Sequence, residues 1–189
     1  RNALTLSLLA EVGQAVAEAG QRPDVRAVLV RGNGRGFSAG IDLNAFSGAD
    51  RDFGADWRAR RLEITDRFQA GLNAVAACPA PTIALLHGFA LGLGLELALA
   101  CDLRLAAAGT QMGLPEARLG LIPDVGGSTR LTKLVGPARA KQLILTGSTV
   151  GPSTAAAWGL INEAVPEADL LGHGRALAAE ISLGAPRAV

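Results

Sequence analysis

Two glycine-rich segments, each directly after a short apolar run, constrain most what this chain can fold into. Residues 25–30 lead into a loop at 32–43, and residues 82–86 lead into a second glycine-rich turn at 88–94. Short apolar runs bounded by glycine predict buried strands. Glycine lets the main chain turn sharply and brings backbone N–H groups close to a ligand. The sequence therefore predicts two ligand-facing turns, each at the end of a strand.

Helix and strand patterns alternate along the rest of the chain. Apolar residues recur four apart over residues 4–16, and with helical spacing over residues 64–75, which predicts two helices with one buried stripe each. Residues 47–56 are polar and contain glycine, which predicts a mobile surface segment. Alternating strands and helices indicate an α/β fold. Further helices are expected at residues 95–100, 137–145 and 170–181, a short strand at 103–106, and a turn with a strand within 159–165.

Composition argues against several kinds of partner. Lys plus Arg number 18 and Asp plus Glu 17, and a net charge of +1 gives no attraction to nucleic acid or to an anionic membrane. Aromatic residues make up 4% with no tyrosine, so a base-stacking surface is not expected. No apolar run reaches the length that spans a membrane. Cys78 and Cys101 lack metal-type spacing, so no metal is expected, and reduced thiols favour the cytoplasm.

The glycine-rich segments allow three readings. A dinucleotide-binding turn needs a third small residue three positions after Gly94, and that position is Leu97. Gly36-Phe37-Ser38-Ala39-Gly40 matches the G-x-S-x-G pattern of serine hydrolases, with His173 later in the chain, but four loop residues separate the strand from this motif. In the third reading, the two turns are halves of one oxyanion hole built from backbone N–H groups.

A series of motifs runs in order along nearly the whole chain. They are Asn2-Ala3-Leu4, FSAGIDL at 37–43, HGFALGLGLEL at 87–97 with ACD at 100–102, Pro115-Glu116, LGLIP at 119–123, Gly126-Gly127 and Arg130-Leu131. In this order they resemble the crotonase superfamily, the enoyl-CoA hydratase/isomerase family. The resemblance implies a crotonase-like spiral of repeated ββα units, assembled as a homotrimer or a dimer of trimers. It also implies that residues 1–189 are the core domain, without the family's N-terminal strand and C-terminal helical trimerisation module.

The resemblance assigns backbone groups to the binding of an acyl-CoA thioester. It implies that the N–H groups of Ile41 and Leu93 hold the thioester oxygen. It also implies a substrate-binding or coenzyme-A-binding role for the neighbouring turn positions, with the carbonyl near Ala39 meeting the adenine. Coenzyme A is then part of the substrate, and no separate cofactor is expected. These turn positions are Ala39, Gly40, Asp42 and Gly92, of which Asp42 is also expected to organise its own loop.

Three carboxylates are candidate acid and base groups. Glu96 and Glu116 lie 116 − 96 = 20 positions apart, the spacing of the hydratase pattern. Glu96 stands in an apolar run, where a buried carboxylate is costly unless it is paired or functional; a core Glu satisfied by backbone or by an Arg is the alternative. For Glu116 the alternative is a helix-start carboxylate. Asp124 either caps the following glycine turn or, as in dienoyl-CoA isomerases of the family, pairs with Glu116.

The expected activity is hydration of trans-2-enoyl-CoA to 3-hydroxyacyl-CoA, with Glu96 and Glu116 as acid and base. The alternative within the family is isomerisation of a dienoyl- or enoyl-CoA by Glu116 and Asp124. Two alternatives from other classes stay open at this point. They are a serine hydrolase that uses Ser38, and a non-catalytic acyl-CoA-binding protein.

Overall fold

The main sheet is built from the short apolar runs of the sequence. The computed structural model describes residues 1–47 and 53–185. The sheet has the strand order β1-β2-β4-β7, and every neighbouring pair is parallel. β2 is buried at every position because both faces of the sheet are covered, which explains its continuously apolar sequence. The strands are β1 (Val28–Arg31), β2 (Thr82–Leu86), β4 (Leu103–Ala107) and β7 (Glu163–Val165).

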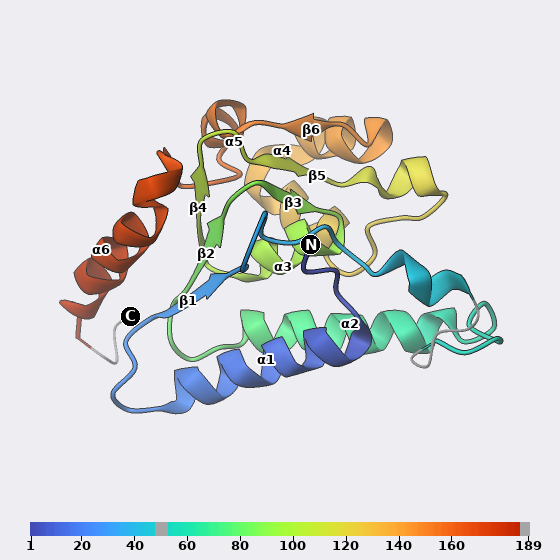
Figure 1. Cartoon of the computed structure of the whole chain (residues 1–189), viewed down its shortest axis with the longest axis horizontal. Coiled ribbons are helices and arrows are strands. Elements are labelled where there is room, and N and C mark those ends of the chain that lie inside the picture. The colour runs from blue at the N-terminus through green and yellow to red at the C-terminus, as the bar shows by residue number, and fades with distance from the viewer. Residues whose placement is uncertain (48–52, 186–189) are drawn as a thin grey trace.

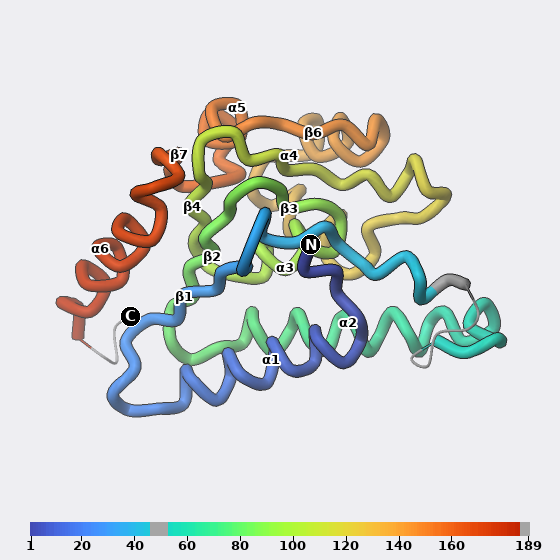
Figure 2. The backbone as a smooth tube through the Cα atoms, viewed as in Figure 1, coloured from blue at the N-terminus to red at the C-terminus, as the bar shows by residue number. Residues whose placement is uncertain are grey.

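Twice along the chain, a strand of the main sheet is followed by a strand of a smaller second sheet. The second sheet contains β3 (Phe89–Leu91), β5 (Gln111–Gly113) and β6 (Thr149–Val150), with β3 parallel to β5 and β5 antiparallel to β6. β2 of the first sheet is followed by β3 of the second and then by α3 (Leu93–Ala100). β4 and β5 repeat this path and lead through η2 (Pro115–Leu119) into α4 (Gly127–Thr146) (Figure 2). The path is the ββα spiral that the resemblance implied.

Helices α1 (Leu6–Gln21) and α2 (Arg61–Ala76) lie side by side and run in the same direction (Figure 1). A Cβ on Gly13 of α1 would lie 2.7 Å from the Gly71 carbonyl oxygen of α2, so glycine permits the close approach. Leu9 and Leu72 are buried between them and the rest of the core. The predicted apolar stripe of α2 is therefore confirmed. In α1 the fully buried residues are Leu6, Leu9, Gly13 and Val16, so the predicted four-residue series is wrong in register, and its Leu8 and Val12 are only partly buried.

The remaining helices lie on the other sides of the sheets. α6 (Leu170–Ser182) packs on the face of the main sheet that carries Leu85, and a Cβ on Gly174 would meet the Leu85 side chain at 2.7 Å. α4 contains a kink at Gly136, with φ 78°, directly before Pro137. The predicted helix at 137–145 is therefore the second half of a longer element. Short segments complete the fold: α5 (Pro152–Trp158), η1 (Leu43–Ser47) and η3 (Glu167–Asp169).

The elements that sequence patterns missed are short ones. β3, β5 and β6 have two or three residues each, too few to show a period. Residues 48–52 of the predicted surface segment lie outside the described residues. Of the residues after them, Ala55 and Asp56 are exposed, but Phe53 is only 2% exposed, so a surface position is wrong for Phe53. In the described part of the chain, no helix has the length and apolar character needed to cross a membrane.

Candidate active site

The two glycine-rich turns meet at the ends of β1 and β2. The N–H of Ser38 donates to the Phe89 carbonyl and the N–H of Leu91 donates to the Ser38 carbonyl, each at 3.1 Å. Gly40 has φ 93°, and a Cβ there would lie 2.6 Å from the Leu91 carbonyl oxygen and 3.4 Å from the Leu93 nitrogen. Only glycine fits both this backbone conformation and this approach. The first turn therefore lies directly against the start of α3.

Ile41 and Leu93 each keep a backbone N–H outside the hydrogen-bond network. The groups on either side of Ile41 are fixed, since Leu4 N–H donates to Gly40 O at 2.8 Å and Asp42 N–H donates to Leu4 O at 3.0 Å. Leu93 is the first residue of α3, where an N–H has no partner within the helix. Among residues 1–47 and 53–185, no backbone hydrogen bond outside helices and strands uses either N–H. Both donors are therefore available to a ligand.

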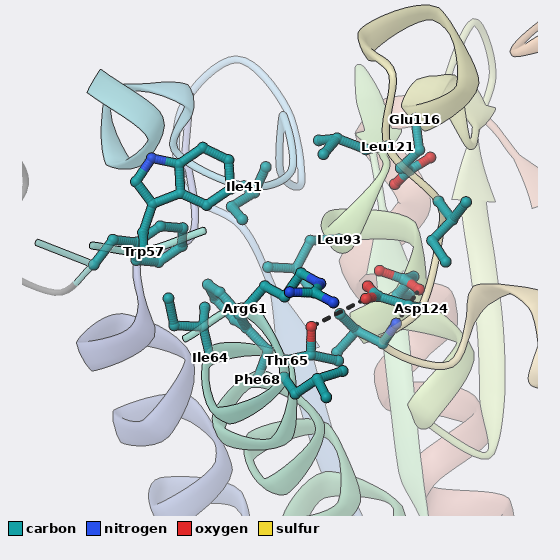
Figure 3. A pocket seen from close by; sticks show the side chains of 15 residues that line it. Ile41, Trp57, Arg61, Ile64, Thr65, Phe68, Leu93, Glu116, Leu121 and Asp124 are labelled. Atoms are coloured by element: carbon teal, nitrogen blue, oxygen red, sulfur yellow. Dashed lines mark hydrogen bonds between the residues drawn. The ribbon is translucent and has the colours of Figure 1, made fainter. Parts of the chain in front are cut away.

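A cavity of about 330 Å³ opens beside these two residues. Its walls come mainly from α2, from the start of α3 and from the segment between η2 and α4 (Figure 3). Apolar side chains form most of the wall, and three acidic residues also face the space. The described residues that line it are Ile41, Phe53, Trp57, Arg61, Leu62, Ile64, Thr65, Phe68, Leu93, Glu96, Glu116, Leu121, Ile122, Asp124 and Val125.

Glu96 lies in α3, and backbone N–H groups at the start of α4 hold its carboxyl. The residue is 2% exposed, and its Oε1 accepts the N–H of Gly127 at 2.6 Å and the N–H of Val125 at 3.1 Å. Burial raises the pKa of this carboxyl to about 8, helped by the negative charges of Glu116 and Asp124, although the two N–H groups oppose the rise. Backbone therefore satisfies one oxygen of Glu96, as the structural alternative expected. The same side chain nevertheless lines the cavity.

Glu116 faces the same cavity from the 3₁₀ turn η2. Its side chain is buried, and Oε2 has no hydrogen-bond partner among the described residues. A Cβ on Gly92, at φ 52°, would lie 2.8 Å from Glu116 Oε1, so glycine at that turn leaves room for the carboxyl. Burial raises the pKa of Glu116, with a further contribution from Asp124. An unpaired buried carboxyl oxygen is costly in a folded protein and marks a group kept for a ligand.

The raised pKa of Glu96 predicts a pH-dependent stability. Its folded-state pKa of about 8 lies above the value of about 4.3 in an unfolded chain. The bound proton therefore makes its full contribution to the free energy of unfolding below about pH 4. This contribution is lost as pH rises through about 8, by up to ~1.4 kcal/mol per pH unit. Glu96→Gln keeps an acceptor for both N–H groups and removes this dependence. Urea denaturation from pH 5 to pH 9 should show the variant gaining stability relative to the unmodified protein; parallel profiles would contradict the assignment.

Asp124 lines the cavity from the segment before α4. Its Oδ2 accepts the hydroxyl of Thr65 at 3.0 Å (Figure 3). Its carbonyl oxygen accepts the side-chain amide of Gln69 at 2.7 Å, so α2 holds this residue at two points. The start of α4 has no side-chain cap, and Gly126 occupies the capping position. The alternative in which Asp124 caps the following helix is therefore wrong. Its carboxylate is instead placed in the same cavity as Glu116.

Comparison with known proteins identifies the family. The family model described as Enoyl-CoA hydratase/isomerase matches residues 1–189. The chain belongs to the enoyl-CoA hydratase/isomerase family. The predicted resemblance, fold and general enzyme class are thereby confirmed.

Individual relatives of the family agree with this assignment. A probable enoyl-CoA hydratase of Mycobacterium bovis is 41% identical over 181 residues, covering 96% of this chain and 67% of that protein. The human mitochondrial enoyl-CoA hydratase domain-containing protein 2 is 42% identical over 194 residues, covering 100% of this chain and 64% of that protein. A crystal structure of an enoyl-CoA hydratase subunit from Geobacillus kaustophilus superposes with a TM-score of 0.88 at 35% identity, covering 98% of this chain and 69% of that one. The chain spans about two thirds of these relatives.

Ser38 does not form a hydrolase site in this family member. It is 2% exposed, its Oγ donates to the Asn2 carbonyl at 2.8 Å, and the same oxygen accepts the Gly40 N–H at 3.1 Å. His87 contacts the Gly34 carbonyl and His173 lies beside Glu163, so among the described residues neither histidine bonds to the serine. A serine without a base is not an activated nucleophile. The structure therefore does not support the serine-hydrolase alternative.

The other predicted turn residues make hydrogen bonds in and next to the two turns. Asp42 accepts the N–H of Asn44 through Oδ1 at 3.0 Å, which confirms that it organises its own loop. The N–H of Gly92 donates to the Gly113 carbonyl at 2.9 Å, and that of Ala39 donates to the Arg1 carbonyl at 3.0 Å. Neither these residues nor Gly40 line the cavity. A coenzyme-A-binding role for them stays a prediction.

Sequence reasoning assigned no role to the part of α2 that lines the cavity. Arg61, Thr65 and Phe68 all face the space, and their spacing of four and three residues puts them on one side of the helix. The sequence shows this spacing, but the prediction for this helix rests on its apolar positions alone. In the part of the chain that the structure describes, no group of three His, Cys, Asp or Glu residues could hold a metal ion.

Proposed function

We propose that this chain catalyses the hydration of a trans-2-enoyl-CoA thioester to the 3-hydroxyacyl-CoA. One observation carries the proposal. The two buried carboxyls, Glu96 and Glu116, line the same cavity as Ile41 and Leu93, whose N–H groups have no backbone acceptor among the described residues outside helices and strands. The printed names of the hydratase relatives are consistent with this reaction.

The backbone donors supply the electrostatic part of the mechanism. The thioester carbonyl oxygen accepts the N–H groups of Ile41 and Leu93, and negative charge grows on this oxygen when the α-carbon becomes enolate-like. The start of α3 adds the favourable end of a helix dipole beside Leu93. Each such fixed donor typically contributes about 3–4 kcal/mol to transition-state stabilisation.

The carboxyls supply the proton-transfer part. Hydration needs one group that takes a proton from water as its oxygen attacks the β-carbon, and one group that gives a proton to the α-carbon. Two nearby carboxyls with raised pKa values share protons as a pair. With the pKa of Glu96 near 8, Glu96 holds its proton at neutral pH and serves as donor, and Glu116 acts as base in its ionised form.

The proposal is tested by following crotonyl-CoA with the full-length protein. Loss of the conjugated-enone absorbance, with formation of 3-hydroxybutyryl-CoA by mass spectrometry, is the expected result. Tight binding of the thioester with no turnover would instead favour the non-catalytic acyl-CoA-binding protein. The predicted homotrimer or dimer of trimers and the predicted cytoplasmic location remain predictions.

A second candidate reaction is favoured by Asp124. Its carboxylate is held against α2 by Thr65, and its negative charge raises the pKa of Glu116, which faces the same space. Two carboxyls placed along a conjugated acyl chain can remove a proton at one carbon and return it at another. This arrangement supports isomerisation of a 3,5-dienoyl-CoA to the 2,4-dienoyl-CoA, without addition of water.

Replacing Asp124 by asparagine separates the two reactions. We expect Asp124→Asn to lower the isomerisation rate by about 10²–10³-fold, because the amide cannot accept the proton, and to change hydration of crotonyl-CoA less than tenfold. The rise of dienoyl absorbance and the fall of enoyl absorbance measure the two rates. Asp66→Asn is the matched control, since Asp66 is exposed on α2 and does not line the cavity. An Asp124→Asn enzyme with unchanged isomerisation would exclude this candidate.

A further inference from the structure

Arg61 brings a positive charge into a cavity whose walls are mostly apolar. It is the first residue of α2, and Figure 3 shows its side chain among the cavity-lining residues near Thr65 and Leu93. Of the described residues that line the cavity, Arg61 is the one basic residue, whereas Glu96, Glu116 and Asp124 are acidic. Its charge therefore distinguishes this side of the cavity from the rest of the wall.

The guanidinium of Arg61 is available for a ligand. Its Nη1 donates to the Arg58 carbonyl at 3.2 Å, and among the described residues no carboxylate lies within ion-pair distance. The neighbouring Arg60, by contrast, is paired with Glu63 at 2.7 Å. A guanidinium offers five N–H donors in a planar fork that matches a carboxylate. Within residues 1–47 and 53–185, the Arg58 carbonyl is therefore the one protein acceptor recorded for the guanidinium of Arg61.

A methyl-ended acyl chain would serve this surface poorly. Arg61 is exposed to solvent, and such a chain laid against its guanidinium would displace water from it without offering an acceptor, which is unfavourable. A chain that ends in a carboxylate would restore the lost hydrogen bonds through a bidentate pair. Glu96 holds its proton at neutral pH and adds no negative charge to the cavity, whereas the charges of Glu116 and Asp124 oppose a second carboxylate, and the bidentate pair with Arg61 has to outweigh them.

We propose that Arg61 selects acyl-CoA thioesters whose acyl chain ends in a carboxylate, the mono-thioesters of dicarboxylic acids. The inference rests on the proposed function, because it takes the cavity to be the acyl site of that reaction. Arg61 acts on binding, by meeting the terminal carboxylate of the acyl chain, and takes no part in proton transfer. The preference therefore appears as a difference in binding affinity between thioesters, and added salt weakens it.

The test compares two saturated thioesters of equal chain length, hexanoyl-CoA and adipoyl-CoA, by titration calorimetry of the full-length protein. We expect adipoyl-CoA to bind about tenfold more tightly, and Arg61→Gln to abolish this preference by weakening adipoyl-CoA alone. The control is Arg67→Gln, which makes the same charge change on the same helix at a position that is exposed, as Arg61 is, but does not line the cavity. This control should keep the tenfold ratio.

Two results would overturn the inference. One is equal affinity of the unmodified protein for both thioesters. The other is an equal loss of affinity for both in Arg61→Gln, which would place the guanidinium on a phosphate of coenzyme A instead of the acyl end. Because these ligands are saturated, binding is measured without turnover. Failure of the crotonyl-CoA assay therefore counts against the proposed reaction alone, and a lost affinity ratio counts against the role of Arg61 alone.

Discussion

Glu116→Gln and Glu96→Gln are each expected to lower kcat for crotonyl-CoA hydration by about 10²–10⁴-fold, with little change in KM. Both substitutions keep the size of the side chain and remove its ability to exchange a proton. In Glu96→Gln the amide oxygen can still accept the N–H groups of Val125 and Gly127, so the start of α4 stays in place. The rate loss then reports proton transfer instead of misfolding.

The double variant sharpens this prediction. If the two carboxyls share one proton-transfer sequence, removing both should cost little more than removing one, because groups that act as a unit are not additive. Glu11→Gln is the control, since Glu11 is exposed on α1 and does not line the cavity. Stopped-flow or steady-state absorbance measures the hydration rates of the two single variants, the double variant and the control. A fully active Glu96→Gln enzyme would remove Glu96 from the mechanism.

The pH profile of the unmodified enzyme offers an independent readout of the same pair. Hydration needs one protonated and one ionised carboxyl, which produces a bell-shaped dependence of kcat/KM with macroscopic pKa values that belong to the pair. The pKa of about 8 for Glu96 places the alkaline limb in that region, where its proton is lost.

The two glycine turns and Glu96 were predictable from local chemistry, whereas Glu116 was singled out by its match to the family pattern. Gly40 and Gly92 adopt positive φ values and leave space for neighbouring backbone or for a carboxyl, so no other residue type fits. Glu96 stood out because a charged residue within an apolar helix is costly. Both signals are visible without knowledge of what packs nearby.

Contacts between distant segments were not predictable in the same way. The hydrogen bond of Thr65 to Asp124 joins residues 59 positions apart, and nothing in either local sequence indicates it. The burial of Phe53 was hidden by its polar neighbours in the sequence. Arg61 likewise reads as an ordinary helix-surface charge until the fold places α2 along the cavity. Substrate selection therefore depends on tertiary packing more than the proton-transfer groups do.

Arg104→Met is expected to lower the free energy of unfolding by about 3–5 kcal/mol, the largest stability change that we predict. Arg104 lies in β4 and is 4% exposed. Its guanidinium donates to four carbonyl oxygens, and burial lowers its pKa. The acceptors are Leu160 at 2.9 Å, Ala98 at 3.3 Å, Cys101 at 2.6 Å and Asp102 at 3.1 Å.

The cost arises because methionine fills the space and leaves these carbonyls without a donor. A buried ion pair can be replaced by apolar residues on both sides at little cost, but backbone carbonyls cannot be removed. Two acceptors, on Ala98 and Cys101, lie at the C-terminal end of α3, whose partial negative charge the guanidinium offsets. Urea denaturation measures the loss, with Arg175→Met on the exposed side of α6 as the control, expected within about 0.5 kcal/mol. Because α3 also carries Leu93 and Glu96, its loosened end should lower kcat at temperatures where the variant is still folded. An Arg104→Met protein as stable as the unmodified one would show that the four hydrogen bonds do not stabilise the fold.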